Sequence, residues 1–116
     1  MYTESLIQPS RVETVARAPS LNDVAQTLGG HRDATVPQNA RFFLDVTAVA
    51  GTTPSMTMNV YGVVNNKLYF IGAFAAVTAV GTYTVQLNNI PDQVCVAPSP
   101  LTGTTPSFTC EVRCVR

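Results

Sequence analysis

The sequence predicts an all-β protein, a two-layer antiparallel β-sandwich, jelly-roll-like or closed into a small barrel, with about six strands, an N-terminal arm and one short helix. Three observations predict it. Apolar and polar residues alternate over most of residues 40–116, turn residues recur about every 10 positions, and the stretch GTTPS occurs at both 51–55 and 103–107. A single open sheet would leave its apolar face in water, so two layers are expected.

The composition indicates one domain with an arm. The chain has 116 residues, of which 46% are hydrophobic and 12% charged, and its formal net charge is zero. The charged fraction is about half the usual ~25%. Half of the charged residues fall in the first third of the sequence, so we divide the chain into an arm, 1–39, and a β-sandwich domain, 40–116. Low charge favours association, so we expect self-association and a surface covered by other protein.

The arm carries one helix signal. Ser20 with Asp23 three residues later resembles a capping box, and Gly29-Gly30 supplies a stop, which predicts a short helix near 21–28. The preceding stretch, 10–18, is predicted to be an edge strand or an extended arm. At the start of the chain, three apolar residues have no local core. They either pack back on the sandwich or reach a neighbouring subunit, and they are Tyr2, Leu6 and Ile7.

Both GTTPS copies are flanked by alternating strands. They predict strands at 41–49 and 55–64 around the first copy, and at 93–97 and 107–115 around the second. The expected inward residues are Phe42, Leu44, Val46, Ala48, Met56, Met58, Val60, Val94, Val96, Phe108, Cys110, Val112 and Cys114. Each copy is expected to be a loop that leads into a strand, because Pro54 has no N–H to offer a ladder. The duplication indicates two similar hairpins, or a chance recurrence of a good turn sequence.

Two further strands are predicted between these hairpins. Asn65-Asn66 suits the positive φ angles of a two-residue type I′ turn, which would lead into a strand at 67–75. Another strand is expected at 82–88. The inward residues are expected to be Leu68, Phe70, Phe74, Tyr83, Val85 and Leu87. This pattern leaves Tyr61 and Tyr69 on the outer face of the sheet.

The sequence offers little acid–base chemistry. A nucleophilic site needs a base beside a Ser or Cys, and the single histidine, His31, lies in a loop-like stretch. In the β region, Asp45 and Glu111 fall on polar strand faces, where they are expected to be solvated or paired with Arg41 or Arg113. We therefore expect no enzyme activity, no catalytic residues and no cofactor.

The three cysteines are predicted to be buried thiols. Cys110 and Cys114 lie four positions apart on one expected strand, which separates their Cα atoms by about 13 Å, too far for a disulfide. An odd cysteine count also argues against a disulfide framework. A metal site needs more ligands close by, so no metal is expected.

The overall charge and hydropathy exclude two classes of partner. A nucleic-acid binder needs excess Lys and Arg, and here the charges balance. The longest apolar run, LYFIGAFAAVTAVG, is shorter than the roughly 18–20 residues that span a bilayer. With no leader-like segment at the start, the chain is expected to be soluble and made in a host cytoplasm.

Three strings together resemble a known family. FFLDVTAVAGTTPSMTMNV, KLYFIGAFAAVTAVGTYTVQL and GTTPSFTCEV are similar to small β-sandwich proteins encoded among the structural genes of tailed bacteriophages. The resemblance covers roughly residues 40–116. This chain differs in its short Asn65-Asn66 turn and in having Cys110 and Cys114 where Phe, Val or Ser is expected.

The resemblance implies a structural role in the virion. Small β-rich phage proteins of this size often act as capsid decoration or cement proteins, so the expected partner is the major capsid protein or another virion protein. The expected partner-binding residues are Tyr2, Leu6, Ile7, Tyr61 and Tyr69. The alternative is a carbohydrate-binding module or a tail or neck adhesin that uses Tyr61 and Tyr69, although the absence of Trp counts against sugar stacking.

Overall fold

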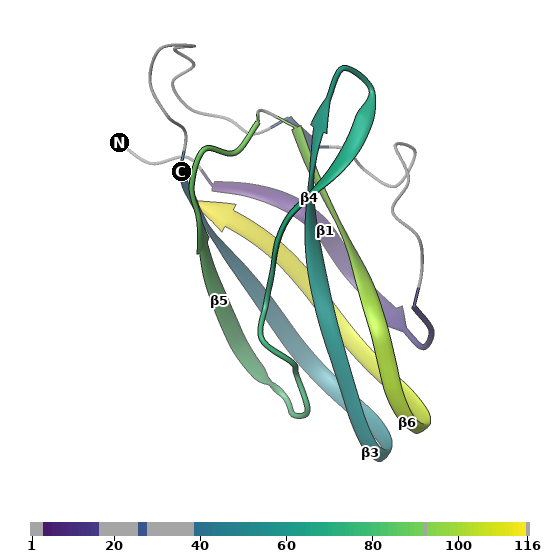
Figure 1. Ribbon diagram of the computed structural model, residues 1–116. Helices are drawn as coiled ribbons and strands as arrows, with labels where there is room; N and C mark the ends of the chain where they lie inside the picture. The colour runs from purple at the N-terminus through teal and green to yellow at the C-terminus, as the bar shows by residue number, and fades with distance from the viewer. Residues whose placement is uncertain (1–3, 17–25, 28–38, 92, 116) are drawn as a thin grey trace.

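The computed structural model describes residues 4–16, 26–27, 39–91 and 93–115. They form β1 (Glu4–Glu13), β2 (Gln26–Thr27), β3 (Ala40–Val64), β4 (Lys67–Ala73), β5 (Gly81–Leu87) and β6 (Gln93–Val115). Every strand pair is antiparallel, and the strands form one sheet that curls over on itself (Figure 1). None of the described residues is helical, so the all-β prediction is confirmed.

A ribbon of two long strands forms the centre of the sheet. β3 and β6 pair along nearly their whole length, from Arg41 opposite Val115 to Val63 opposite Gln93. The predicted strands at 41–49 and 55–64 are the two halves of β3, and those at 93–97 and 107–115 lie in the two halves of β6. Figure 1 shows both strands doubling back at the lower end of the molecule, where the ribbon bends as a unit.

The two GTTPS copies form that bend together. Ala50 lies opposite Ser107, Thr52 opposite Thr104, and Ser55 opposite Thr102. The prediction of two separate hairpins is therefore wrong, because each half of β3 pairs with a half of β6 and not with the other half of β3. The partner strand supplies the hydrogen-bonding groups that a separate hairpin would have to provide within itself.

The two copies also share one backbone conformation. Gly51 and Gly103 both have φ of 107°, and Thr53 and Thr105 have φ of 45° and 46°. A Cβ atom at Gly51 would lie 2.6 Å from the Thr105 carbonyl oxygen, and one at Gly103 would lie 2.7 Å from the Thr52 carbonyl oxygen. Only glycine fits here, because both the backbone angle and the close approach exclude a side chain. The repeat thus encodes one pseudo-symmetric bend built from two copies.

A single apolar core lies inside the curled sheet. Twelve of the thirteen residues predicted to point inward from β3 and β6 are buried. Ala48 is exposed, because the register shifts between Val46 and Ala48, and Val49 packs against the core instead. Both halves of the ribbon contribute to one cluster, which also contains Phe74 and Val77. Tyr83, Val85 and Leu87 of β5 are half-buried against it, as predicted. Burying each large side chain is worth about 1.5–3 kcal/mol, so this cluster is the main source of stability.

The other strands flank the two halves of the ribbon. Residues 40–50 and 107–115 lie side by side, with β5 next to the former and β1 next to the latter. Residues 55–64 and 93–101 also lie side by side, with β4 next to the former and β2 next to the latter. Each half of the curled sheet therefore contains four strand segments.

The described part of the N-terminal region belongs to the same sheet. β1 pairs with β6 from Glu4 opposite Val115 to Glu13 opposite Phe108, with two register shifts between. The predicted helix at 21–28 is not seen, because Gln26–Thr27 is an extended strand paired with Val94 and Gln93. Pairing with β6 outweighs the local capping signal there. The rest of 21–28 lies outside the described residues.

Candidate functional site

The β3–β4 hairpin carries the aromatic residues singled out in the sequence. Asn65 and Asn66 have φ of 53° and 59°, which confirms the predicted two-residue turn. Tyr61 lies opposite Phe70, and the two rings meet edge to face with centroids 6.0 Å apart. Tyr69 instead lies opposite Gly62. Because directly opposed residues share a face, Tyr61 and Tyr69 point to opposite faces, and the prediction that they share the outer face is wrong.

A β-bulge causes this difference. Val60 lies opposite Gly72, but Tyr61 lies opposite Phe70, so Ile71 is an extra residue in β4. A slip of one residue exchanges the two faces of a strand. Phe70, predicted to point inward, is consequently 62% exposed, while Phe74 on the other side of the bulge is buried as predicted.

Among the described residues, large apolar side chains are exposed on the β3–β4 hairpin, along and just after β1, and at Val80, which precedes β5. On the hairpin, Val64 and Tyr69 are each 51% exposed on one face and Phe70 is 62% exposed on the other face. We call these three residues, which together cover both faces of the hairpin, the hairpin surface. On and just after β1, the exposed residues are Leu6, Val12 and Val15. Aromatic residues exposed at a strand end are suited to anchoring a protein partner.

The residues predicted to bind a partner are not brought together. Tyr69 lies in the hairpin surface, and Tyr61 is half-buried beside Phe70. Leu6 is 38% exposed on β1, but its neighbour Ile7 is buried in the core. Tyr2 lies outside the described residues. The exposure of Phe70 was not predicted from the sequence, because the local composition does not indicate a bulge at Ile71.

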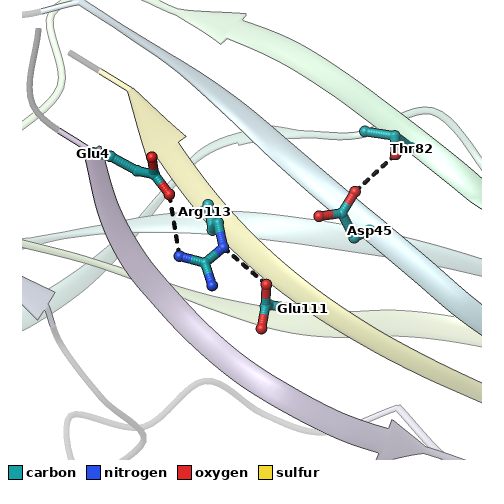
Figure 2. A network of polar contacts seen from close by, with 5 residues as sticks. All are labelled: Glu4, Asp45, Thr82, Glu111 and Arg113. Carbon is teal, nitrogen blue, oxygen red and sulfur yellow. Dashed lines mark hydrogen bonds and ion pairs between the residues drawn. The ribbon is translucent and has the colours of Figure 1, made fainter.

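A polar network covers the outer side of the sheet half that contains β1 (Figure 2). Arg113 of β6 donates from Nε to Glu111 Oε1 at 2.8 Å and from Nη1 to Glu4 Oε1 at 3.2 Å. The hydrogen bond and charge of Glu111, with a smaller effect from Glu4, raise the pKa of Arg113 above its ordinary value. The predicted pairing of Glu111 with Arg113 is confirmed, and the contact with Glu4 ties β1 to β6. As a largely exposed network, it adds little stability.

Two carboxylates face each other across strands in this region. Asp45 lies directly opposite Glu111, and like charges in that position repel. Each carboxylate has another partner, because Thr82 Oγ1 donates to Asp45 Oδ1 at 2.7 Å while Glu111 accepts from Arg113. They line an open, shallow depression of ≈ 470 Å³ with Ser10.

The described residues contain no group of three or more His, Cys, Asp or Glu able to hold a metal ion. His31 lies outside them. Cys95, Cys110 and Cys114 are buried and form no disulfide, which confirms the cysteine prediction. No described helix has the length and apolar character needed to cross a membrane.

Comparison of the chain with protein-family models, with curated proteins and with solved structures finds no match.

Proposed function

We propose that this chain is a virion structural protein of a tailed phage, a capsid cement or decoration protein that stabilises the shell through protein–protein contacts. The proposal combines the sequence resemblance with the strand order, the surface composition and the exposed apolar residues. The protein is made in the host cytoplasm and works in the virion, against the major capsid protein or another virion protein.

The strand order is the main observation that supports the proposal. One half of the curled sheet runs β1, 107–115, 40–50, β5, and the other runs β2, 93–101, 55–64, β4. Each group contains four antiparallel segments and combines early and late parts of the chain. This order matches that of a jelly roll. We therefore infer a two-layer, jelly-roll-like sandwich. Viral capsid proteins commonly use this arrangement.

The surface supports contact with protein over other partners. The charged fraction of 12% and zero net charge leave few charges to desolvate when a surface is covered. The hairpin surface offers apolar and aromatic anchors on both faces of the hairpin, which suits a partner groove that receives the hairpin between its walls. In a shell, many identical copies act together, so each contact can be modest.

Glycan binding, the alternative considered from the sequence, has less support. It was based on Tyr61 and Tyr69 as a shared platform, and the register of the hairpin directs them to opposite faces. Tyr61 also meets Phe70 edge to face, which leaves less of its ring for a sugar.

The direct test uses the phage whose genome encodes the chain. Virions are purified by density gradient, and their proteins are quantified by mass spectrometry. We expect the chain at a copy number close to that of the major shell protein. Absence from purified virions would contradict the proposal, and a copy number far below the shell protein would assign the chain to the neck or tail instead.

A second experiment tests the contact surface. In a phage that lacks the gene, incorporation of the double variant Tyr69→Ser with Phe70→Ser is compared with that of the wild-type chain. We expect most of the incorporation to be lost. The matched control is Val80→Ser, since Val80 is also 59% exposed but lies outside the hairpin. Equal incorporation of both variants would contradict a role of the hairpin surface.

A further inference from the structure

The two outer strands of one sheet half differ in how their edges are protected. β1 and β5 flank residues 107–115 and 40–50, and among the described residues each pairs on one side only. An edge strand presents unpaired N–H and C=O groups, which proteins usually guard with charges, prolines, bulges or short length. β1 has such guards: Glu4, Pro9, Arg11 and Glu13, with two register shifts against β6.

β5 has none of these guards. Its sequence, GTYTVQL, contains no charge and no proline, and it pairs with β3 without a register shift from Leu87 opposite Ala40 to Gly81 opposite Val46. The remaining edge strands do not share this property. β4 carries Lys67 and the bulge at Ile71, and β2 is only two residues long. Figure 1 shows β5 at the margin of the molecule.

We propose that β5 pairs antiparallel with β5 of a second copy of this chain, about a two-fold axis through Thr84, and so joins the two sheets into one. This inference is independent of the proposed virion role, because it concerns the isolated protein. A two-fold axis at Thr84 places residues 81, 82, 83 and 84 opposite 87, 86, 85 and 84 of the second copy. This register uses all seven residues of the strand and keeps the same face inward in both copies.

The side chains are self-complementary in this register. On the inner face, Tyr83 meets Val85 of the second copy, an aromatic and β-branched pair of the kind that stabilises sheets. Both side chains are half-buried in the single chain, so pairing would bury them further. Leu87 meets Gly81, where no side chain obstructs it. On the outer face, Thr84 meets Thr84, another favourable cross-strand pair.

The outer face also has matching donors and acceptors. Thr82 donates its hydroxyl proton to Asp45, so its oxygen remains able to accept from the Gln86 amide of the second copy. Thr84 accepts from Arg41 Nη1 at 3.3 Å and keeps its own proton to donate across the axis. A two-fold axis places residues near the axis close to the same residues of the second copy. Charged side chains there would repel each other. The uncharged β5 avoids this cost, whereas β1 would not.

The first test is the oligomeric state of the purified full chain, measured by sedimentation velocity over a concentration series. A ladder of seven residues is a small interface, and interfaces below about 1,200 Å² are usually weak, so we expect a reversible, concentration-dependent dimer. A monomer up to the highest soluble concentration would overturn the proposal.

Two charge variants locate the axis. Thr84→Lys and Thr84→Glu each place like charges opposite each other, and we expect each to raise the dimer Kd by about tenfold or more. An equimolar mixture of the two variant chains should restore the dimer, because opposite charges then meet. Thermal melting confirms that each variant is folded, and Ser10→Lys on the exposed face of β1 is the matched control. A dimer that Thr84→Lys does not weaken would overturn the proposal.

Single cysteines give a readout that does not depend on added charge. Opposed Cα atoms in an antiparallel pair are about 4.5–5.5 Å apart, which suits a disulfide. Thr84→Cys should therefore cross-link the two copies under mild oxidation. Gln86→Cys should not, because its copies lie about 13 Å apart along the strands. Equal cross-linking of the two variants, or preferential cross-linking of Gln86→Cys, would overturn this register.

Discussion

The chain reverses direction in two different ways, and the two regions depend on different parts of the sequence. At the tip of the β3–β4 hairpin, two adjacent residues with positive φ, Asn65 and Asn66, make the turn alone. At the GTTPS bend, two segments far apart in the sequence turn together, and each glycine fits against the backbone of the other copy.

This difference explains why the GTTPS motif occurs twice in the chain. A local turn has its cause in its own residues, so a single copy suffices. The bend needs a partner that approaches within van der Waals contact, and the partner must have the same shape if the bend is to be symmetric. Repetition of GTTPS is thus a requirement of one structural unit and not a duplication of two.

Gly51→Ala is expected to have the largest effect, a loss of at least about 3 kcal/mol in the free energy of unfolding. Alanine at this position would have to adopt φ of 107°. Its Cβ would lie 2.6 Å from the Thr105 carbonyl oxygen, which is a backbone atom and cannot rotate away. Urea denaturation measures the change.

Gly81→Ala is the matched control for this prediction. Gly81 also has a positive φ, but the atom nearest to a Cβ added at this position would be Tyr83 Cε2 at 3.7 Å, an ordinary contact. We expect a loss of only about 1 kcal/mol. Equal losses at Gly51 and Gly81 would contradict the close approach of the two GTTPS copies.

The double variant Gly51→Ala with Gly103→Ala tests whether the two GTTPS copies act as one bend. Since both glycines belong to one bend, we expect the double variant to lose about 1 kcal/mol less than the sum of the two single losses. A stabilising osmolyte in the urea titration keeps the variants folded at the start. Combining Gly51→Ala with Asn66→Ala should be additive within about 0.5 kcal/mol, because the two sites share no partners. Strict additivity of the glycine pair would show that each copy bends alone.

The hairpin turn should be less sensitive. Asn66→Ala is expected to cost about 1 kcal/mol, since alanine tolerates φ of 59° poorly. Asn66→Gly should be neutral or stabilising by up to about 0.5 kcal/mol, because Asn-Gly suits this turn best. Thermal melting monitored by circular dichroism distinguishes the two. A larger loss for Asn66→Gly than for Asn66→Ala would contradict a type I′ turn.

Phe70→Ala is expected to cost little stability, within about 1 kcal/mol, which is the contribution of its edge contact with Tyr61. Phe74→Ala, on the buried side of the bulge, should cost about 3–5 kcal/mol. Urea denaturation of the two variants tests the bulge directly. The reverse order would mean that β4 runs without an extra residue at Ile71.

Much of the fold follows from the period of two. The alternation of Phe42, Leu44 and Val46, or of Tyr83 and Val85, correctly predicted which side chains point inward. The Asn65-Asn66 turn was also predictable, because its cause lies within two residues.

Other features depend on interactions that the local sequence does not contain. The bend requires knowledge that residues 51–55 face residues 103–107. Gln26–Thr27 is extended because β6 offers a partner, against the local helix signal. Phe70 is exposed because a bulge shifts the register, and so the hairpin surface was only partly predicted through Tyr69. The polar contact of Glu111 with Arg113 was predictable from their spacing on one strand, but the contact with Glu4 was not.

The pairing of β1 with β6 has a consequence for biosynthesis. Glu4 lies opposite Val115, so an early strand finds its neighbour only after the late one has been made. Until β6 leaves the ribosome, β3 also lacks its main partner, and the apolar faces of both early strands stay open. Such distant pairing makes folding slow. The nascent protein therefore passes through a stage in which chaperones have the greatest opportunity to bind it.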